Sequence, residues 1–149
     1  MLPLVHTLAI ALHILFAAAW FGLGLALPAL ARAAASGGAP GAGRVIGMMN
    51  GSVVLFYVFA VTNWTLGMQL GFREQYNAWP YHTSLTLGLV LVLVQVVLIR
   101  TGWNRLAGAT ETVEAERGRQ RMSLGIGIGH ALWLVIFVLM YLGRGVLAA

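Results

Sequence analysis

Four histidines stand within or at the edge of long apolar stretches, in a chain that has neither lysine nor aspartate. An ionisable side chain in membrane hydrocarbon is costly, and it normally faces a bundle interior where it meets a functional partner. His6 and His13 are seven residues apart, so on one helix they share a face, about 10.5 Å apart along the axis. Trp20 continues this stripe, which predicts that the face meets a polar or flat partner.

The elements that must position these side chains are four apolar stretches long enough to cross a bilayer as helices, at 3–30, 45–72, 80–101 and 122–146. The chain is 60% hydrophobic and 9% charged, whereas a soluble domain carries about 25% charged residues. We therefore expect a single integral membrane domain, residues 1–149, with an all-α fold. The predicted architecture is a four-transmembrane-helix bundle with up-down-up-down topology.

The arginines predict how the bundle is oriented in the membrane. Seven of them flank or lie in the first and third connections, namely Arg32, Arg44, Arg100, Arg105, Arg117, Arg119 and Arg121. Positively charged loops normally stay in the cytoplasm, so both termini are expected on the non-cytoplasmic side of a bacterial inner (plasma) membrane. The third connection, 101–121, is predicted to be the longest loop, with a short surface helix at 110–121. No basic patch is interleaved with aromatic residues, so no nucleic-acid partner is expected.

In this orientation the histidines fall into two pairs at two depths. His6 and His82 lie near the outer ends of the first and third helices. His13 lies about 15 Å deep and His130 about 12 Å from the inner face, counting the helical rise. His13 and His130 therefore both approach the middle of a bilayer core that is about 30 Å thick.

Paired imidazoles on facing helices are typical axial ligands of a b-type haem. Small residues would let a macrocycle lie against the backbone; Ala9 and Ala17 flank His13, and Gly125-Ile-Gly-Ile-Gly-His130 precedes the second histidine. The chain has no cysteine, which excludes covalent c-type attachment. The candidate haem-binding residues are His13, His130, His82, His6, Trp20, Gly127 and Gly129. His13 and His130 are the preferred iron ligands, and one haem b is favoured over two because the offset between the pairs leaves little room.

Structural explanations of the same residues stay open. Glycines spaced along a span often serve helix packing alone. His6 and His82 are also compatible with interfacial positions, and His13 or His130 with hydrogen bonds to Asn63, Thr62 or Tyr57. Buried polar groups in a membrane need some partner, but that partner need not be a cofactor.

The segment Leu12-His13-Ile-Leu-Phe-Ala-Ala-Ala-Trp20-Phe-Gly-Leu-Gly-Leu-Ala-Leu-Pro28 resembles the first helix of the HemJ and CopD-like membrane proteins. HemJ proteins are small, four-helical bacterial protoporphyrinogen oxidases associated with haem b. The motif Trp79-Pro-Tyr-His82-Thr-Ser-Leu85 is similar to that family's third helix, which implies His82 as an alternative partner of His13. Two charged positions of the family are Ala29 and Ser84 here, so the resemblance implies haem binding more than oxidase activity.

The function expected is therefore that of a membrane cytochrome, in electron transfer or a haem-linked redox step, with a quinone or redox protein as partner. One alternative is a structural or assembly subunit of a larger respiratory or photosynthetic complex. Another is a porphyrinogen oxidase, so whether the chain is an enzyme stays open, as does a homo-oligomeric state. Copper handling, which the CopD likeness implies, is disfavoured because the six methionines are scattered and copper(I) favours soft sulfur ligands.

Overall fold

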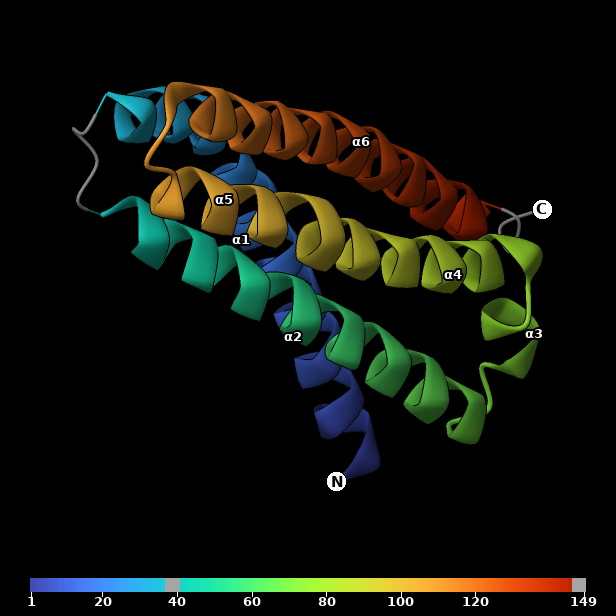
Figure 1. The fold of residues 1–149 in the computed structure, drawn as a ribbon. Coiled ribbons are helices and arrows are strands. Elements are labelled where there is room, and N and C mark those ends of the chain that lie inside the picture. The colour runs from blue at the N-terminus through green and yellow to red at the C-terminus, as the bar shows by residue number, and fades with distance from the viewer. Residues whose placement is uncertain (37–40, 146–149) are drawn as a thin grey trace.

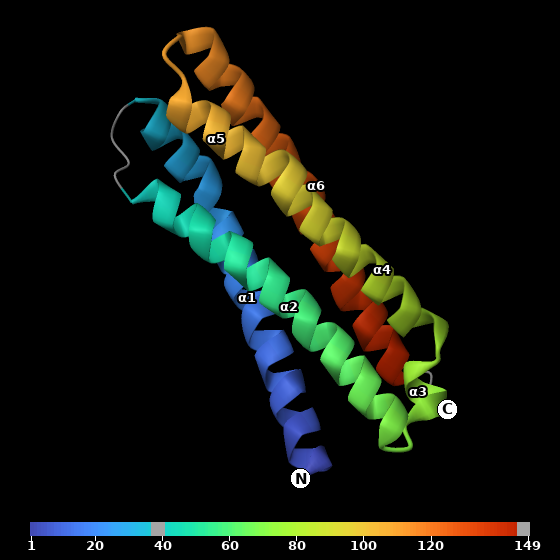
Figure 2. The same ribbon diagram turned by 60° about the horizontal axis from the view of Figure 1, so that its bottom comes forward.

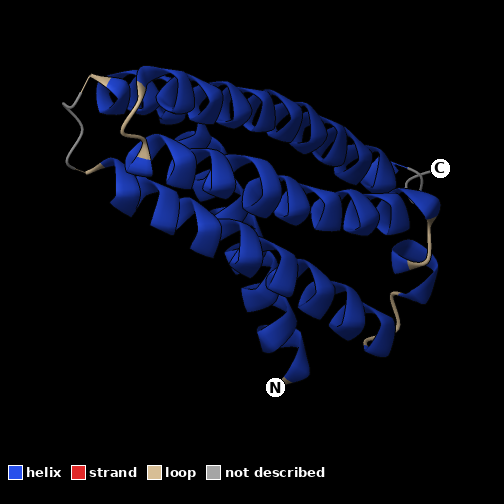
Figure 3. Cartoon of the chain, in the orientation of Figure 1, coloured by secondary structure: helices blue, strands red, loops and turns tan. Residues whose placement is uncertain are grey.

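The structure, a computed structural model, describes residues 1–36 and 41–145, and all regular elements in these ranges are helical, as Figure 1 and Figure 3 show. The elements are α1 (Leu2–Ala35), α2 (Ala42–Gln69), α3 (Arg73–Tyr76), α4 (Trp79–Val94), the π-helical turn η1 (Gln95–Arg100), α5 (Thr101–Gly108) and α6 (Thr112–Gly145). Because α4, η1 and α5 are continuous, the described chain forms four helices long and apolar enough to span a membrane. The predicted all-α four-helix fold is confirmed.

Successive long helices run antiparallel, so the bundle has up-down-up-down topology. The first turn of α1 and the last turn of α6 lie at one end (Figure 2), which we call the terminal end. The α1–α2 and α5–α6 connections lie at the opposite end, which we call the loop end. In both Figure 1 and Figure 2 the first turns of α1 stand apart from α6.

The third connection differs most from its prediction, because residues 101–121 do not form a long loop. The third helix continues to Gly108 and α6 begins at Thr112. The segment 110–121 is therefore not a separate surface helix; most of it forms the first turns of α6. Charged residues mark where a helix leaves hydrocarbon, but packing between helices can continue it further.

Close packing of α5 on α6 explains this extension. A Cβ added at Gly118 would lie 2.6 Å from Leu106 N and 2.8 Å from Gly102 O, both backbone atoms of α5. The packing of α5 against α6 therefore stabilises both helices beyond the predicted membrane boundary.

The other helix ends shift less. Helix α1 continues through Pro28 to Ala35, five residues beyond the predicted end, because the alanines after Pro28 are strong helix formers. Pro80 lies in the first turn of α4, as expected for a residue without an amide hydrogen. The predicted end of the fourth helix, residue 146, lies outside the described residues.

The hydrophobic core lies between the middle of the bundle and the loop end. Its fully buried members include Trp20, Leu27, Met49, Leu91 and Ile99, which come from α1, α2, α4 and η1. The opposite, outward faces of the helices are covered by large apolar side chains that remain exposed. A surface of this kind fits lipid rather than water.

The α5–α6 contact gives a test of the fold. We expect Gly118→Ala to destabilise the protein by about 1–3 kcal/mol, because its Cβ would press on backbone atoms that cannot swing away. Gly127→Ala is the matched control on α6, since a Cβ there meets nothing within 4 Å. Thermal unfolding of both variants in one detergent measures the difference, and equal midpoints would show that α5 and α6 do not pack as described.

Candidate functional site

His13 is held on α1 by a contact with the α2 backbone. Its Nδ1 lies 3.1 Å from the carbonyl oxygen of Phe56, and the two rings stack with centroids 4.8 Å apart. A carbonyl can only accept a hydrogen bond, so Nδ1 must carry the proton that is donated. No described residue bonds Nε2, which is therefore left with its lone pair in the neutral ring.

A cavity of about 570 Å³ opens beside His13. Its walls are Ile10, His13, Ile14, Ala17 and Ala18 of α1, Trp133, Phe137, Met140 and Tyr141 of α6, together with Asn63, Gln75, Tyr76 and Tyr81. The side chains that line the cavity from α1 and α6 are mostly apolar or aromatic. Ala17 and Ala18 have small side chains and leave space beside α1. The cavity thus combines an imidazole with the apolar surroundings that are typical of cofactor sites.

A hydrogen-bonded chain borders the cavity toward the terminal end. His6 Nε2 donates to the Tyr76 hydroxyl over 3.1 Å, and that hydroxyl donates to Asn63 Oδ1 over 3.0 Å. His6 is only 8% exposed and stacks on Phe72 with ring centroids 6.0 Å apart. The chain links α1, α2 and α3, so His6 is a buried structural partner rather than an interfacial residue bonded only to water or headgroups.

His130 lies elsewhere, packed against α1 closer to the loop end. Its Nδ1 donates to the carbonyl oxygen of Ile126, one turn earlier on α6, over 2.8 Å. Its ring packs edge-on against Phe21, with centroids 4.9 Å apart. A Cβ on Gly24 would come within 3.1 Å of His130 Nε2, so the glycine makes room for this imidazole. Nε2 is buried without a hydrogen-bond partner among the described residues.

The structure therefore does not bring the preferred pair together. His13 lines the cavity, whereas His130 is not among its lining residues. Nor does His82 line it: this ring is exposed, its Nε2 donates to Asn77 Oδ1 over 3.1 Å, and it meets Trp64 edge-on. Of the four histidines, only His13 borders this cavity.

Trp20 is buried in a polar network and not in the cavity wall. Its Nε1 donates to Gln95 Oε1 over 2.8 Å, and Gln95 Nε2 donates to Asn50 Oδ1 over 2.8 Å. Gln95 is fully buried and is the first residue of the π-helical turn η1. Turns of this type are frequent at functional sites. The network joins α1, α2 and η1 in the middle of the bundle.

Two of the three glycines before His130, Gly125 and Gly129, make close helix contacts, in line with the structural explanation left open above. A Cβ on Gly129 would lie 2.8 Å from the Trp20 ring, and one on Gly125 would lie 2.7 Å from Leu98 Cβ. Gly127 faces away from both contacts and has nothing within 4 Å. Neither Gly127 nor Gly129 lines the cavity beside His13.

Several cavity residues were not anticipated from the sequence. Met140, Tyr76, Tyr81 and Gln75 come from three elements, and Gln75 Nε2 donates to the Tyr81 hydroxyl over 3.1 Å. A methionine or a tyrosine in an apolar helix usually fills a core, so composition alone gives no signal. Gln75 and Tyr76 lie on the short helix α3, which the apolar pattern of the four long helices does not predict.

Within residues 1–36 and 41–145, no group of three or more histidine, cysteine, aspartate or glutamate side chains is placed to hold a metal ion. A bare metal site of that kind therefore has no support there. Comparison of the chain with family models, curated proteins and solved structures gives no match.

The Trp20–Gln95–Asn50 network gives a second test. We expect Gln95→Leu to lower stability by about 1–3 kcal/mol, because it leaves the buried indole N–H of Trp20 and the half-buried amide oxygen of Asn50 without partners. Gln69→Leu, at an exposed position on α2, is the control and should change little. Thermal unfolding in detergent compares the two; an unchanged midpoint for Gln95→Leu would mean that the network does not hold the helices together.

Proposed function

We propose that this protein is a membrane b-type haem protein in which His13 would ligate the iron and the cavity between α1 and α6 would hold the macrocycle. The observation that carries the proposal is the hydrogen bond from His13 Nδ1 to Phe56 O at the wall of that cavity. Metal-binding histidines commonly donate their second nitrogen to a backbone carbonyl, which fixes the tautomer and the ring orientation.

The volume and the lining of the cavity support this proposal. Its volume of about 570 Å³ falls within the range of roughly 300–1,000 Å³ that is typical of ligand sites. Trp133 and Phe137, stacked at 5.5 Å with an interplanar angle of 6°, offer flat apolar surfaces on α6. The porphyrin itself supplies the equatorial nitrogens, so only axial ligands are needed from the protein.

Met140 is the second side chain that we propose would hold the haem iron. It lines the cavity from α6, whereas His13 lines it from α1. A thioether opposite an imidazole is an established haem coordination, and it raises the reduction potential relative to two imidazoles. This assignment replaces His130 and His82, neither of which lines the cavity.

The expected chemistry is electron transfer, since bound haem supplies a one-electron couple. The protein's own part is to hold His13 in one tautomer, exclude water with apolar walls and border the site with the His6–Tyr76–Asn63 chain. The structure adds no support for the porphyrinogen oxidase alternative. The two positions that are charged in the resembled family are here Ala29, which is exposed, and Ser84, which is buried.

A quinone is the second ligand that this cavity favours. One side of the cavity carries the polar groups of Asn63, Gln75, Tyr76 and Tyr81, and the rest of its lining is mostly apolar. A quinone needs hydrogen-bond donors of this kind for its headgroup and an apolar surface for its tail. Organic extraction of purified protein separates the two ligands: a quinone without haem would favour this second assignment.

The haem proposal predicts a Soret absorption band in protein purified from haem-supplied cells. His13→Ala should lose the band, because the axial nitrogen is gone. His130→Ala and His82→Ala are matched controls that should keep it. Met140→Leu should retain haem but lower the reduction potential measured by redox titration. A wild-type protein without haem, or a His13→Ala variant with an unchanged spectrum, would refute the assignment.

We propose further that the loop end faces the cytoplasm of a bacterial inner membrane, because most arginines gather there. The chain has no cysteine, so single cysteines report topology directly. Glu74→Cys, at the terminal end, should react with a membrane-impermeant thiol reagent in intact cells, and Thr110→Cys, at the loop end, only after permeabilisation. The reverse pattern would show that the orientation is inverted.

A further inference from the structure

The cavity beside His13 has a buried side and an exposed side. Its lining residues on α3 and α4 are buried or half-buried, whereas its exposed lining residues, Ile14, Ala18, Phe137 and Tyr141, come from α1 and α6. Figure 2 shows that α1 diverges from α6 toward the terminal end. The cavity therefore opens sideways, between these two helices, and we call the four exposed residues its rim.

The rim lies at the level of the membrane hydrocarbon. Ile14 is twelve residues after Leu2, where α1 begins, and Phe137 is eight residues before Gly145, where α6 ends. Counting the helical rise, they lie about 18 Å and 12 Å from the terminal end. Both levels fall within a bilayer core that is about 30 Å thick. A molecule that reaches the opening must therefore come from the lipid.

The short helix α3 covers the cavity on the side of the terminal end. Tyr76 is 6% exposed, and Trp64 Nε1 donates to its carbonyl oxygen over 3.1 Å. Its ring lies against α2 at Gly67, where a Cβ would collide with it. Gln75 Nε2 donates to the Tyr81 hydroxyl, which ties α3 to α4. A water-soluble protein that approaches from this side meets α3 rather than the cavity.

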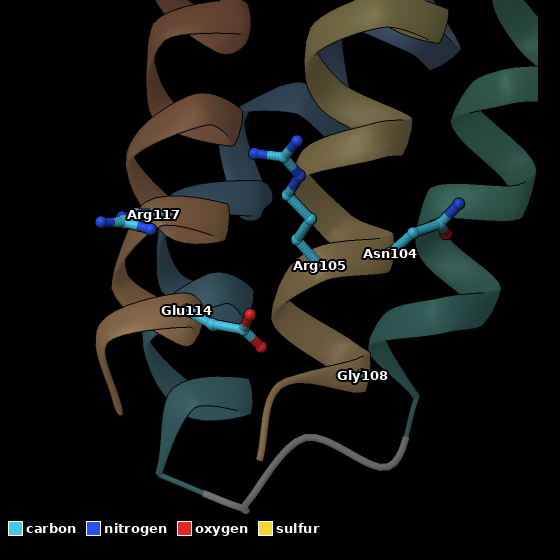
Figure 4. Close-up of a pocket in the computed structure, with 5 residues that line it drawn as sticks. All are labelled: Asn104, Arg105, Gly108, Glu114 and Arg117. Atoms are coloured by element: carbon cyan, nitrogen blue, oxygen red, sulfur yellow. The ribbon is translucent and has the colours of Figure 1, made fainter. Parts of the chain in front are cut away.

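The rim also lacks the charges that guide protein partners. Neither arginine nor glutamate occurs among the described residues that line the cavity. Figure 4 shows three charged side chains, Arg105, Glu114 and Arg117, near the α5–α6 connection at the opposite, loop end. Complementary charges steer proteins to one another, and the rim offers none to a water-soluble redox protein.

We propose that a membrane-dissolved quinol with an isoprenoid tail docks at the rim and is the redox partner of this site, in place of a water-soluble redox protein. The inference rests on the proposed function, which assigns a haem iron to His13. Tyr141 offers a hydroxyl to a quinol oxygen, and Ile14 and Phe137 offer apolar surface to the tail. Oxidation of one quinol gives one electron to the ferric iron of each of two protein molecules, and forms quinone and two protons that are released to water.

Photolabelling with an azido derivative of decylubiquinone tests the docking place on the whole protein in phosphatidylcholine nanodiscs, and it does not require haem. We expect the label on the segments that carry the rim, 10–18 and 133–141. Ala18→Trp should lower this labelling about tenfold, because the indole obstructs the opening. Ala11→Trp is the matched control, since Ala11 is exposed on α1 but does not line the cavity.

Stopped-flow absorption on the same samples tests the partnership. Decylubiquinol should reduce the haem of wild type and Ala11→Trp at equal rates, and that of Ala18→Trp about tenfold more slowly, because access is blocked. Dithionite should reduce all three to the same extent, which checks their haem content. Ile14→Trp, on the same rim, takes the place of Ala18→Trp if that variant does not fold.

Label confined to other segments, or labelling that Ala18→Trp leaves unchanged, would overturn the docking place. Equal reduction rates in wild type and Ala18→Trp would overturn the partnership. Labelling of the rim in a protein without a Soret band would uphold the docking place and refute the haem assignment, so the two failures are distinguishable.

Discussion

The constraint on which this structure depends is that a polar group in membrane hydrocarbon must find its partner inside the protein. Trp20, Gln95 and Asn50 satisfy one another across three elements. His13 and His130 each donate a hydrogen bond from Nδ1 to a backbone carbonyl. The bonds of Trp20 and His13 fix where α1 lies against η1 and α2, whereas the bond of His130 stays within α6. They also leave two imidazole nitrogens without a partner among the described residues, one beside a cavity and one in a packed interior.

Small residues decide how closely the helices approach at each level. Gly24 admits the His130 ring and Gly129 admits the Trp20 ring, so α1 and α6 interlock near the middle of the bundle. Gly102 and Gly118 do the same for α5 and α6 at the loop end. Toward the terminal end α1 separates from α6, and the space left between them is the cavity beside His13.

The molecule is therefore divided along its length. The half at the loop end is filled by the hydrophobic core and ends in a charged surface. The half at the terminal end contains the cavity beside His13, whose lining includes histidine, tyrosine and amide side chains.

The sequence by itself determined the four membrane helices and their antiparallel order, because hydrophobic length and short connections leave few alternatives. It also singled out His13, since a histidine deep in a span needs a partner. Only the tertiary structure decided which partner each histidine has. Helical spacing gives the depth of a side chain along the axis but not its neighbours across the bundle. His13 and His130 share a depth by counting, yet the tilt of α1 and the gap left by Gly24 direct them to different places. The helical extension of residues 101–121 was likewise decided by the contact between Gly118 and α5, which no local pattern shows.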